Sequence, residues 1–170
     1  MAAHKFLKNA SGQIAEEAAV ESSAGAGDEG KIVALNSSGQ IDLTMMPTGI
    51  GPDTESMVTS ENLAAGNLVN IYDVATVKTA RKADASNGRR AHGFVLAASV
   101  SPAAALVYLG GKITGLSGLT NGAAEYLSDS AAGTTTETAP TTAAHIVQEV
   151  GYAVSATELQ FIPQQPITLA

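Results

Sequence analysis

The chain has 170 residues, a formal net charge of −7 and no cysteine, and its length suits one domain or one domain with an additional arm. The absence of cysteine excludes disulfide frameworks, thiolate nucleophiles and zinc ribbons, and the acidic balance argues against a general nucleic-acid binder. Ala is the commonest residue with 31 copies, while Leu, Ile, Val and Phe together number 37, so we expect a thin core that depends on neighbouring chains.

The N-terminal region contains a short internal repeat. The stretch NASGQI at residues 9–14 recurs 27 positions later as NSSGQI at 36–41. Asn, Ser and Gly favour turns, and an apolar stretch precedes each copy. The sequence therefore predicts two short strand–turn–strand elements in this region.

Three further segments complete the region. Residues 13–21 have the propensity for two turns of helix, residues 22–30 form a linker of small residues, and residues 43–52 are typical of an extended connector. We therefore predict an extended N-terminal arm over residues 1–53, followed by a domain at 54–170.

Within the linker, Gly25 to Lys31 matches two phosphate-binding patterns, G-x-G-x-x-G and G-x-x-x-x-G-K. The context excludes both. Asp28 and Glu29 place two carboxylates where a phosphate would lie, and Ile32 stands where the magnesium-binding Ser or Thr belongs. We expect no nucleotide and no other cofactor.

From residue 54 onward, short apolar or alternating runs are separated by glycine-rich turns. Asn87-Gly88 and Asn121-Gly122 are pairs that favour type I′ hairpin turns. Short strands with such turns predict a small β-sandwich or β-barrel, so the chain is assigned to the all-β class. The candidate strands are residues 67–72, 74–78, 93–100, 104–109, 123–127, 145–154 and 157–162.

No catalytic or metal-binding arrangement is recognisable in the sequence. His4, His92 and His145 are dispersed without a second ligand at metal-binding spacing, and no G-x-S-x-G elbow is present. We interpret His92 and His145 as surface or trimer-axis side chains. No run reaches the ~20 apolar residues that cross a bilayer, and the first residues lack the apolar stretch of a secretory signal. We expect a protein that is not an enzyme, has no catalytic, metal or cofactor site, and is made without export.

Basic residues are concentrated in one stretch of this acidic chain. Residues 61–90 carry five basic and three acidic residues, whereas acids outnumber bases on both sides of the stretch. Two interpretations remain open: a solvated loop beside a turn, or a loop that contacts an acidic partner surface, including a neighbouring copy of the chain. The five basic residues of this possible contact loop are Lys78, Arg81, Lys82, Arg89 and Arg90.

Several blocks of the sequence resemble virion proteins of tailed bacteriophages. Residues 24–51, with the runs GKIVALN and MMPTGIG, are similar to the arm of these proteins. The likeness covers residues 5–170, and the arm has neither collagen-like repeats nor heptads, which favours a compact protein over a long fibre. Further blocks resemble the β-domain of phage capsid decoration (cement) and head-fibre proteins at residues 80–97, 107–111, 118–128 and 146–155.

This resemblance implies a homotrimeric structural protein on the outer surface of a phage capsid, where it stabilises contacts between major capsid proteins. Its partners would be the major capsid protein and its own copies, without nucleic acid or membrane. It would lie on the virion exterior, and in the host cytoplasm during assembly. The alternative is a head or tail fibre module that recognises a host-surface glycan. The resemblance carries over no catalytic residue.

The apolar residues of the arm have no core of their own in the sequence. We therefore expect them to contact the capsid or a neighbouring protomer, and the isolated monomer to be unstable. These residues are Phe6, Leu7, Ile14, Ile32, Val33, Leu35, Ile41, Met45 and Met46.

Overall fold

The computed structural model describes residues 5–47 and 51–170, and the chain divides into two compact units, Met1–Gly51 and Pro52–Ala170. We call these the N-terminal unit and the C-terminal unit. The predicted all-β class is confirmed, because the helical residues in the described ranges belong to three single-turn 3-10 helices. No helix there is long and apolar enough to span a membrane. The 3-10 helices are η1 (Ala26–Asp28), η2 (Leu43–Met45) and η3 (Ala85–Asn87).

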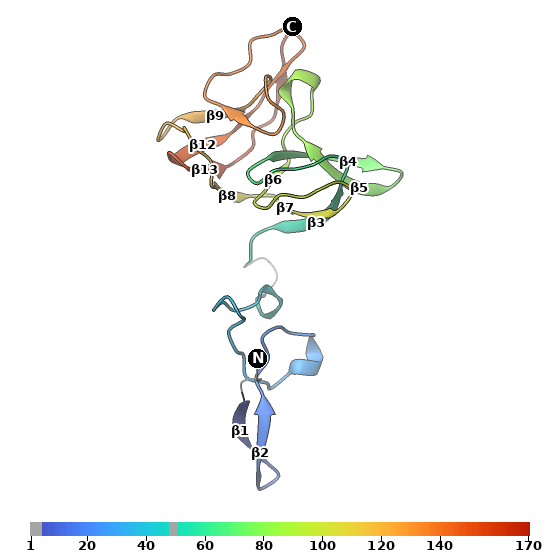
Figure 1. Cartoon of the computed structure of the whole chain (residues 1–170), viewed down its shortest axis with the longest axis vertical. Helices are drawn as coiled ribbons and strands as arrows, with labels where there is room; N and C mark the ends of the chain where they lie inside the picture. Colours follow the sequence, from blue (N-terminus) through green and yellow to red (C-terminus); the bar gives the residue numbers. More distant parts are fainter. Residues whose placement is uncertain (1–4, 48–50) are drawn as a thin grey trace. The chain divides into compact units, whose positions relative to one another are not determined.

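Five strands of the C-terminal unit close into a small barrel (Figure 1). The order around the barrel is β3-β5-β4-β6-β7, and β7 pairs with β3 to close the ring. β3 and β5 are parallel, and the other neighbours are antiparallel. These strands are β3 (Thr54–Thr59), β4 (Leu68–Val74), β5 (Val77–Lys82), β6 (Gly93–Val95) and β7 (Ala104–Tyr108).

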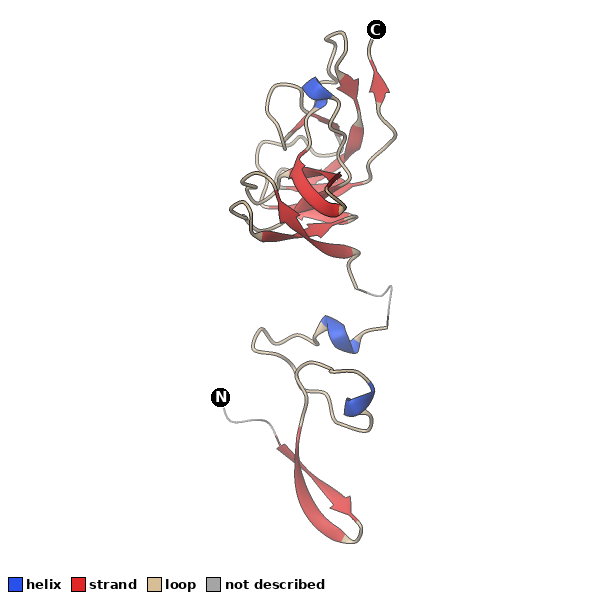
Figure 2. Cartoon of the chain, turned by 90° about the vertical axis from the view of Figure 1, so that its right-hand side faces the viewer, coloured by secondary structure: helices blue, strands red, loops and turns tan. Residues whose placement is uncertain are grey.

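The C-terminal unit also contains an open antiparallel sheet in the order β10-β9-β12-β13-β8. A separate short pair joins β11 to β14 in the C-terminal tail, and Figure 2 shows the strands in red. The strands outside the barrel are β8 (Gly111–Thr114), β9 (Ala124–Leu127), β10 (Thr135–Thr136), β11 (Ile146–Val147), β12 (Glu149–Ser155), β13 (Glu158–Phe161) and β14 (Ile167–Thr168).

Two clusters of buried side chains stabilise the C-terminal unit. The first belongs to the barrel strands and the loops next to them, and the second joins barrel strands to the open sheet. The first consists of Met57, Leu63, Val69, Ala80, Val95, Ala105 and Val107. The second consists of Leu68, Ala83, Ala85, Ala91, Phe94, Ile113, Leu127, Ile146, Val150, Leu159 and Phe161.

Alternation along the strands explains how both clusters form. Neighbouring residues of a strand point to opposite faces, so β4 sends Val69 to the first cluster and Leu68 to the second. Phe94 of β6 is fully buried and belongs to the second cluster. Its ring stacks on Tyr108 at a centroid distance of 5.3 Å and meets the edge of Phe161 at 5.4 Å. The barrel and the open sheet are therefore bound together by aromatic packing.

The N-terminal unit contains one hairpin, made of β1 (Lys5–Ala10) and β2 (Gln13–Ala18). Ser11 and Gly12 at its turn have φ of 54° and 85°, as a type I′ turn requires. The Asn9 side-chain oxygen accepts the N–H of Gly12 at 2.7 Å. The first copy of the repeat thus forms a strand–turn–strand element.

Three predictions for this unit are wrong. The connector predicted to be extended at 43–52 begins with the 3-10 helix η2, and its residues 48–50 lie outside the described residues. The helix predicted at 13–21 is absent, because residues 13–18 form β2 and pair along the whole of β1. The second copy of the repeat forms a turn without flanking strands. Asn36 explains this: its N–H donates to the carbonyl of Gln40, and its side-chain oxygen accepts the N–H groups of Ser38 and Gln40. The turn is satisfied locally and needs no strand ladder.

The two Asn-Gly pairs form turns, but not the predicted type I′ hairpins. Only the glycine has positive φ in each pair, 74° at Gly88 and 80° at Gly122. Gly88 follows η3, whose start is capped by the Asp84 carboxylate accepting the N–H of Ser86. The turn at Gly122 lies between β8 and β9, which are not neighbours in the sheet. The loop at Gly88 therefore ends a helical turn, and the loop at Gly122 joins two strands that pair with other strands.

Candidate interaction surfaces and a polar cavity

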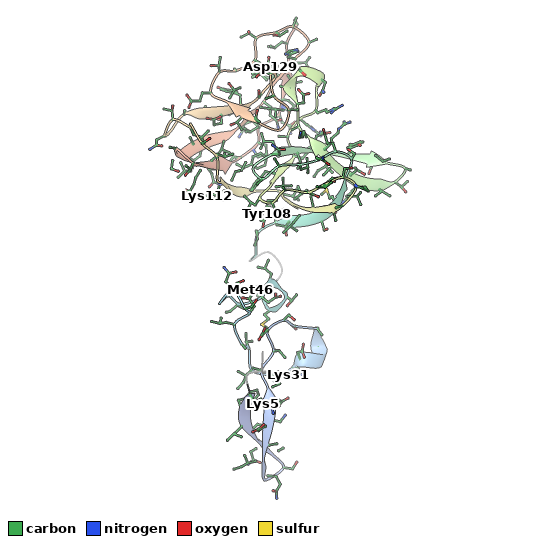
Figure 3. All side chains as sticks on the ribbon, viewed as in Figure 1. Lys5, Lys31, Met46, Tyr108, Lys112 and Asp129 are labelled. Carbon is green, nitrogen blue, oxygen red and sulfur yellow. The ribbon has the colours of Figure 1, made fainter. Side chains whose placement is uncertain are left out.

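The N-terminal unit has no buried residue within 5–47. Of the nine apolar residues predicted to contact a partner, Phe6 and Met45 are half-buried and the others are exposed, up to 70% at Leu7 and 80% at Ile14. Figure 3 shows side chains standing out from the ribbon of this unit, for example around Lys5 and Lys31. The predicted residues are thus available for contact, and the structure adds Leu43 to them, with 55% exposure.

The hairpin presents its apolar side chains on two different faces. Leu7 lies opposite Glu16, and Ile14 lies opposite Asn9, so the strand alternation puts Leu7 and Ile14 on one face. Phe6 belongs to the other face. The sequence alone grouped Phe6 with Leu7, whereas the register separates them.

Ion pairs lie beside the apolar residues on both hairpin faces. Lys5 bonds Glu16 at 2.8 Å, and Lys8 pairs with Glu17. Because at least one member of each pair is solvent-exposed, each pair contributes at most about 1 kcal/mol. They are compatible with the backbone register of the hairpin, but they do not replace a core.

The segment between the hairpin and η2 is held by a few polar contacts. Val20 and Val33 form a parallel bridge, in which the N–H of Val20 donates to the carbonyl oxygen of Ile32 at 2.9 Å. The Asp28 carboxylate accepts the N–H of Ala24 at 2.6 Å and bonds the Lys31 ammonium at 2.9 Å. These contacts lower the pKa of Asp28, the backbone N–H most. The Lys31 ammonium is therefore engaged by a carboxylate of its own loop.

The basic residues do not form one loop, because Lys78, Arg81 and Lys82 lie in strand β5. Lys78 bonds Glu55 at 2.8 Å. The Arg81 guanidinium lies 3.9 Å from the centre of the Tyr72 ring, and its Nε donates to the Asn70 side chain. Of these three side chains, Lys78 alone pairs with a carboxylate of the described residues, whereas Arg81 is held by an aromatic ring and an amide of its own chain.

Arg89 and Arg90 follow η3. Asp84 and Arg89 form an antiparallel bridge, and Nε of Arg90 lies 2.7 Å from Nε2 of His92. The other ring nitrogen of His92 accepts the N–H of Ile71 at 2.9 Å. Burial lowers the pKa of His92, and the charge of Arg90 lowers it further. His92 is thus bonded within its own chain rather than standing free at the surface.

His145 makes the one histidine–carboxylate contact in the described ranges, with its Nδ1 3.0 Å from Asp129. The two residues are 16 positions apart, so no local motif indicated the pair. It connects the start of β11 to the loop after β9, and both side chains are largely shielded from solvent.

A polar cavity of about 490 Å³ opens in the C-terminal unit, and the sequence did not predict it. Its walls come from three loops and from β9 and β10. The lining residues are Ala65, Gly66, Asn67, Gly115, Leu116, Ser117, Gly118, Leu119, Thr120, Glu125, Gly133, Thr134, Thr135, Thr136 and Glu137.

Glu125 is the unusual member of this wall. It lies on β9 two residues before Leu127, so both side chains point to the buried face of the strand. Its side chain is 1% exposed, and neither carboxylate oxygen has a hydrogen-bond partner. Burial raises the pKa of Glu125; the nearby Thr135 hydroxyl opposes the rise, although it does not meet hydrogen-bond geometry with either carboxylate oxygen, and the charge of Glu137 adds to the rise.

Replacing Glu125 by glutamine should raise the stability of the free protein at neutral pH. Below pH of about 4.5 the carboxyl is protonated in the folded and the unfolded chain alike. As the pH rises through the raised pKa, the unfolded chain ionises first, so the parent protein loses stability. We expect E125Q to gain on the order of 1 kcal/mol at pH 8 and nothing at pH 4, measured by urea unfolding.

The matched control is E149Q, which removes an exposed carboxylate on the neighbouring strand β12. It should change stability by less than about 0.5 kcal/mol at either pH. Equal stability changes for both variants across the pH range would contradict a buried, ionisable Glu125.

Comparison with known proteins gave no relative: no family model, no curated protein and no solved structure matches this chain.

Proposed function

We propose that the protein is a homotrimeric decoration (cement) protein that binds the outer surface of a phage capsid through its N-terminal unit. The observation that carries this proposal is the unburied apolar surface of the N-terminal unit. Within residues 5–47, eight large apolar side chains are exposed by 38% or more, and no residue is buried. The likeness of residues 24–51 to virion-protein arms supports the same role.

The energetics explain why such a unit needs a partner. Ordering the backbone opposes folding by about 1–2 kcal/mol per residue, and an isolated hairpin is marginal in water. Burying one Leu or Ile side chain contributes about 1.5–3 kcal/mol. With its apolar side chains in solvent, the N-terminal unit gains little of that energy within its own chain. A capsid surface or a neighbouring protomer supplies the missing burial.

A trimer suits this arrangement because several weak contacts act together. Three N-terminal units linked in one particle raise the apparent affinity without any new contact, provided that their spacing matches the shell. Each unit then needs to bury only a modest area. The major capsid protein repeats over the shell and offers such matching sites.

The test is binding of the full-length protein to capsid shells assembled without it. The double variant Leu7→Ser, Ile14→Ser removes the two apolar side chains that share one hairpin face. We expect at least a tenfold loss of affinity, since each lost side chain contributes roughly 1.5 kcal/mol or more. Cosedimentation with shells measures it.

The matched control replaces two exposed apolar residues of the C-terminal unit, Val100 and Ile167, both 69% exposed, by serine. This control should bind as the parent does. Cryo-electron microscopy of the decorated shell then reads location and symmetry: a regular layer of trimers supports the proposal. A few copies at one vertex or on the tail would instead indicate the fibre module.

A further inference from the structure

We propose that the polar cavity of the C-terminal unit is a binding site for a small primary amine, held by the Glu125 carboxylate. This site is independent of the decoration role. The cavity volume of about 490 Å³ lies within the range of small-molecule sites, and its wall combines Leu116 and Leu119 with several hydroxyl groups.

The charge of the wall selects a cation. Glu125 and Glu137 both line the cavity, and none of its lining residues is Lys, Arg or His. Glu137 has one partner, the N–H of Thr120 at 2.7 Å, whereas Glu125 has none. A buried carboxylate without a partner destabilises the folded protein, because it has lost its water and gained no hydrogen bond in return. A cationic donor would remove this destabilisation and the repulsion between the two carboxylates, which a neutral ligand would not.

An amine fits this wall better than a metal ion. Calcium takes 6–8 oxygen ligands at short range, in the order of 2.3–2.6 Å. The described parts of the chain hold no group of three or more metal-ligating side chains. An alkylammonium instead donates three hydrogen bonds, and Thr135, which pairs with Leu127 across β9 and β10, shares the strand face of Glu125 and can offer its hydroxyl as a further acceptor.

The wall also separates primary amines from quaternary ones. Quaternary ammonium groups are recognised mainly through aromatic faces, and no Phe, Tyr or Trp lines the cavity. Space for the ligand comes from glycines: at Gly66 and Gly133 an added Cβ would lie 3.0 Å from Leu116 and Asn67 respectively. The ligand class is therefore a small aliphatic primary amine or diamine.

The experiment is isothermal titration of the full-length protein with 1,4-diaminobutane at pH 8 and low salt. We expect saturable binding that E125Q weakens by at least tenfold, because a hydrogen bond to a charged group contributes about 1.5–3 kcal/mol. E149Q should bind within about twofold of the parent. Circular dichroism and thermal unfolding of both variants establish that they are folded.

Two further measurements distinguish binding in the cavity from non-specific attraction of the diamine to the acidic protein surface. Glu125 and Glu137 are the titratable groups that line the cavity, so parent binding should weaken as the pH falls to 5, and E125Q binding should depend less on pH. Tetramethylammonium, which has no N–H donor, should not compete. The proposal is overturned if E125Q binds the diamine as the parent does, if no heat is released up to about 20 mM diamine, or if calcium chloride binds more tightly than the diamine.

Discussion

Alanine at position 151 is expected to lower the free energy of unfolding by more than about 4 kcal/mol. Gly151 has φ of 145°, and a Cβ there would lie 1.8 Å from the carbonyl oxygen of Gln160, closer than any real contact. The residue sits in β12, paired with Glu125 on β9 and with Phe161 on β13, where the register to β9 shifts. Because β12 is central in the open sheet, moving its backbone disturbs two ladders at once.

The measurement is urea unfolding of the full-length protein at neutral pH. Gly110→Ala is the matched control, since a Cβ at Gly110 meets no atom within 4 Å and its φ is not positive. The control should stay within about 1 kcal/mol of the parent. A Gly151→Ala protein as stable as this control would mean that β12 follows a different path beside Gln160.

The alternation of polar and apolar residues predicted strand β4, but it did not predict that both faces of the strand are buried. The run at 67–72 alternates polar and apolar residues, which indicates a strand covered on one face. In the fold Leu68, Val69 and Asn70 are all buried, because one face of β4 meets the barrel interior and the other meets the second cluster. Two covered faces follow from how distant strands pack, and a local pattern carries no information about that packing.

Strand β3 shows why other elements were missed. Its sequence, TESMVT, contains the strand formers Thr and Val, but four of its six residues are polar and the apolar residues Met57 and Val58 are adjacent rather than alternating. It becomes a strand because it pairs with β5 and β7 and so closes the barrel. That pairing links residues far apart in the chain, so it stabilises β3 only once the barrel has formed. The strand predicted at 74–78 fails for a complementary reason: Ala75 and Thr76, with φ of 48° and 72°, form the turn between β4 and β5.

The two candidate sites differ in how well they could be predicted from the sequence. The exposed apolar residues of the N-terminal unit were predicted from their number in a region without a core. Glu125 was not, because in the run AEYL it looks like the polar member of a half-exposed strand. The actual register turns Glu125 and Leu127 inward and leaves Tyr126 partly exposed. A shift of one residue in the register of β9 would exchange its buried and exposed faces, and the sequence around Glu125 is compatible with either register.

The thin core expected from composition is unevenly distributed. Both clusters of buried side chains belong to Pro52–Ala170, with Phe94 and Leu68 fully buried in a single chain. The described residues of the N-terminal unit bury nothing fully. The dependence on a partner that we expect from the composition therefore concerns the N-terminal unit alone, because the C-terminal unit supplies its own core.

Deleting residues 1–51 should consequently separate stability from binding. We expect the remaining 52–170 chain to unfold cooperatively, with a free energy within about 1 kcal/mol of the full-length protein, because no buried cluster loses a member. Binding to capsid shells should fall at least 100-fold, since the deletion removes the whole exposed apolar surface of the N-terminal unit. Urea unfolding and cosedimentation with shells measure the two effects on one preparation.

The deleted segment, residues 1–51, is tested by itself in the same two ways. Residues 1–51 alone should show no cooperative unfolding transition, because the described part of this unit has no buried side chain to lose. Fused to an unrelated trimeric carrier, the same residues should restore shell binding, since the carrier supplies the multivalency and the segment supplies the contact. Binding by 52–170 alone would move the capsid contact to the barrel or the open sheet, and the exposed side chains of the N-terminal unit would then need a different partner.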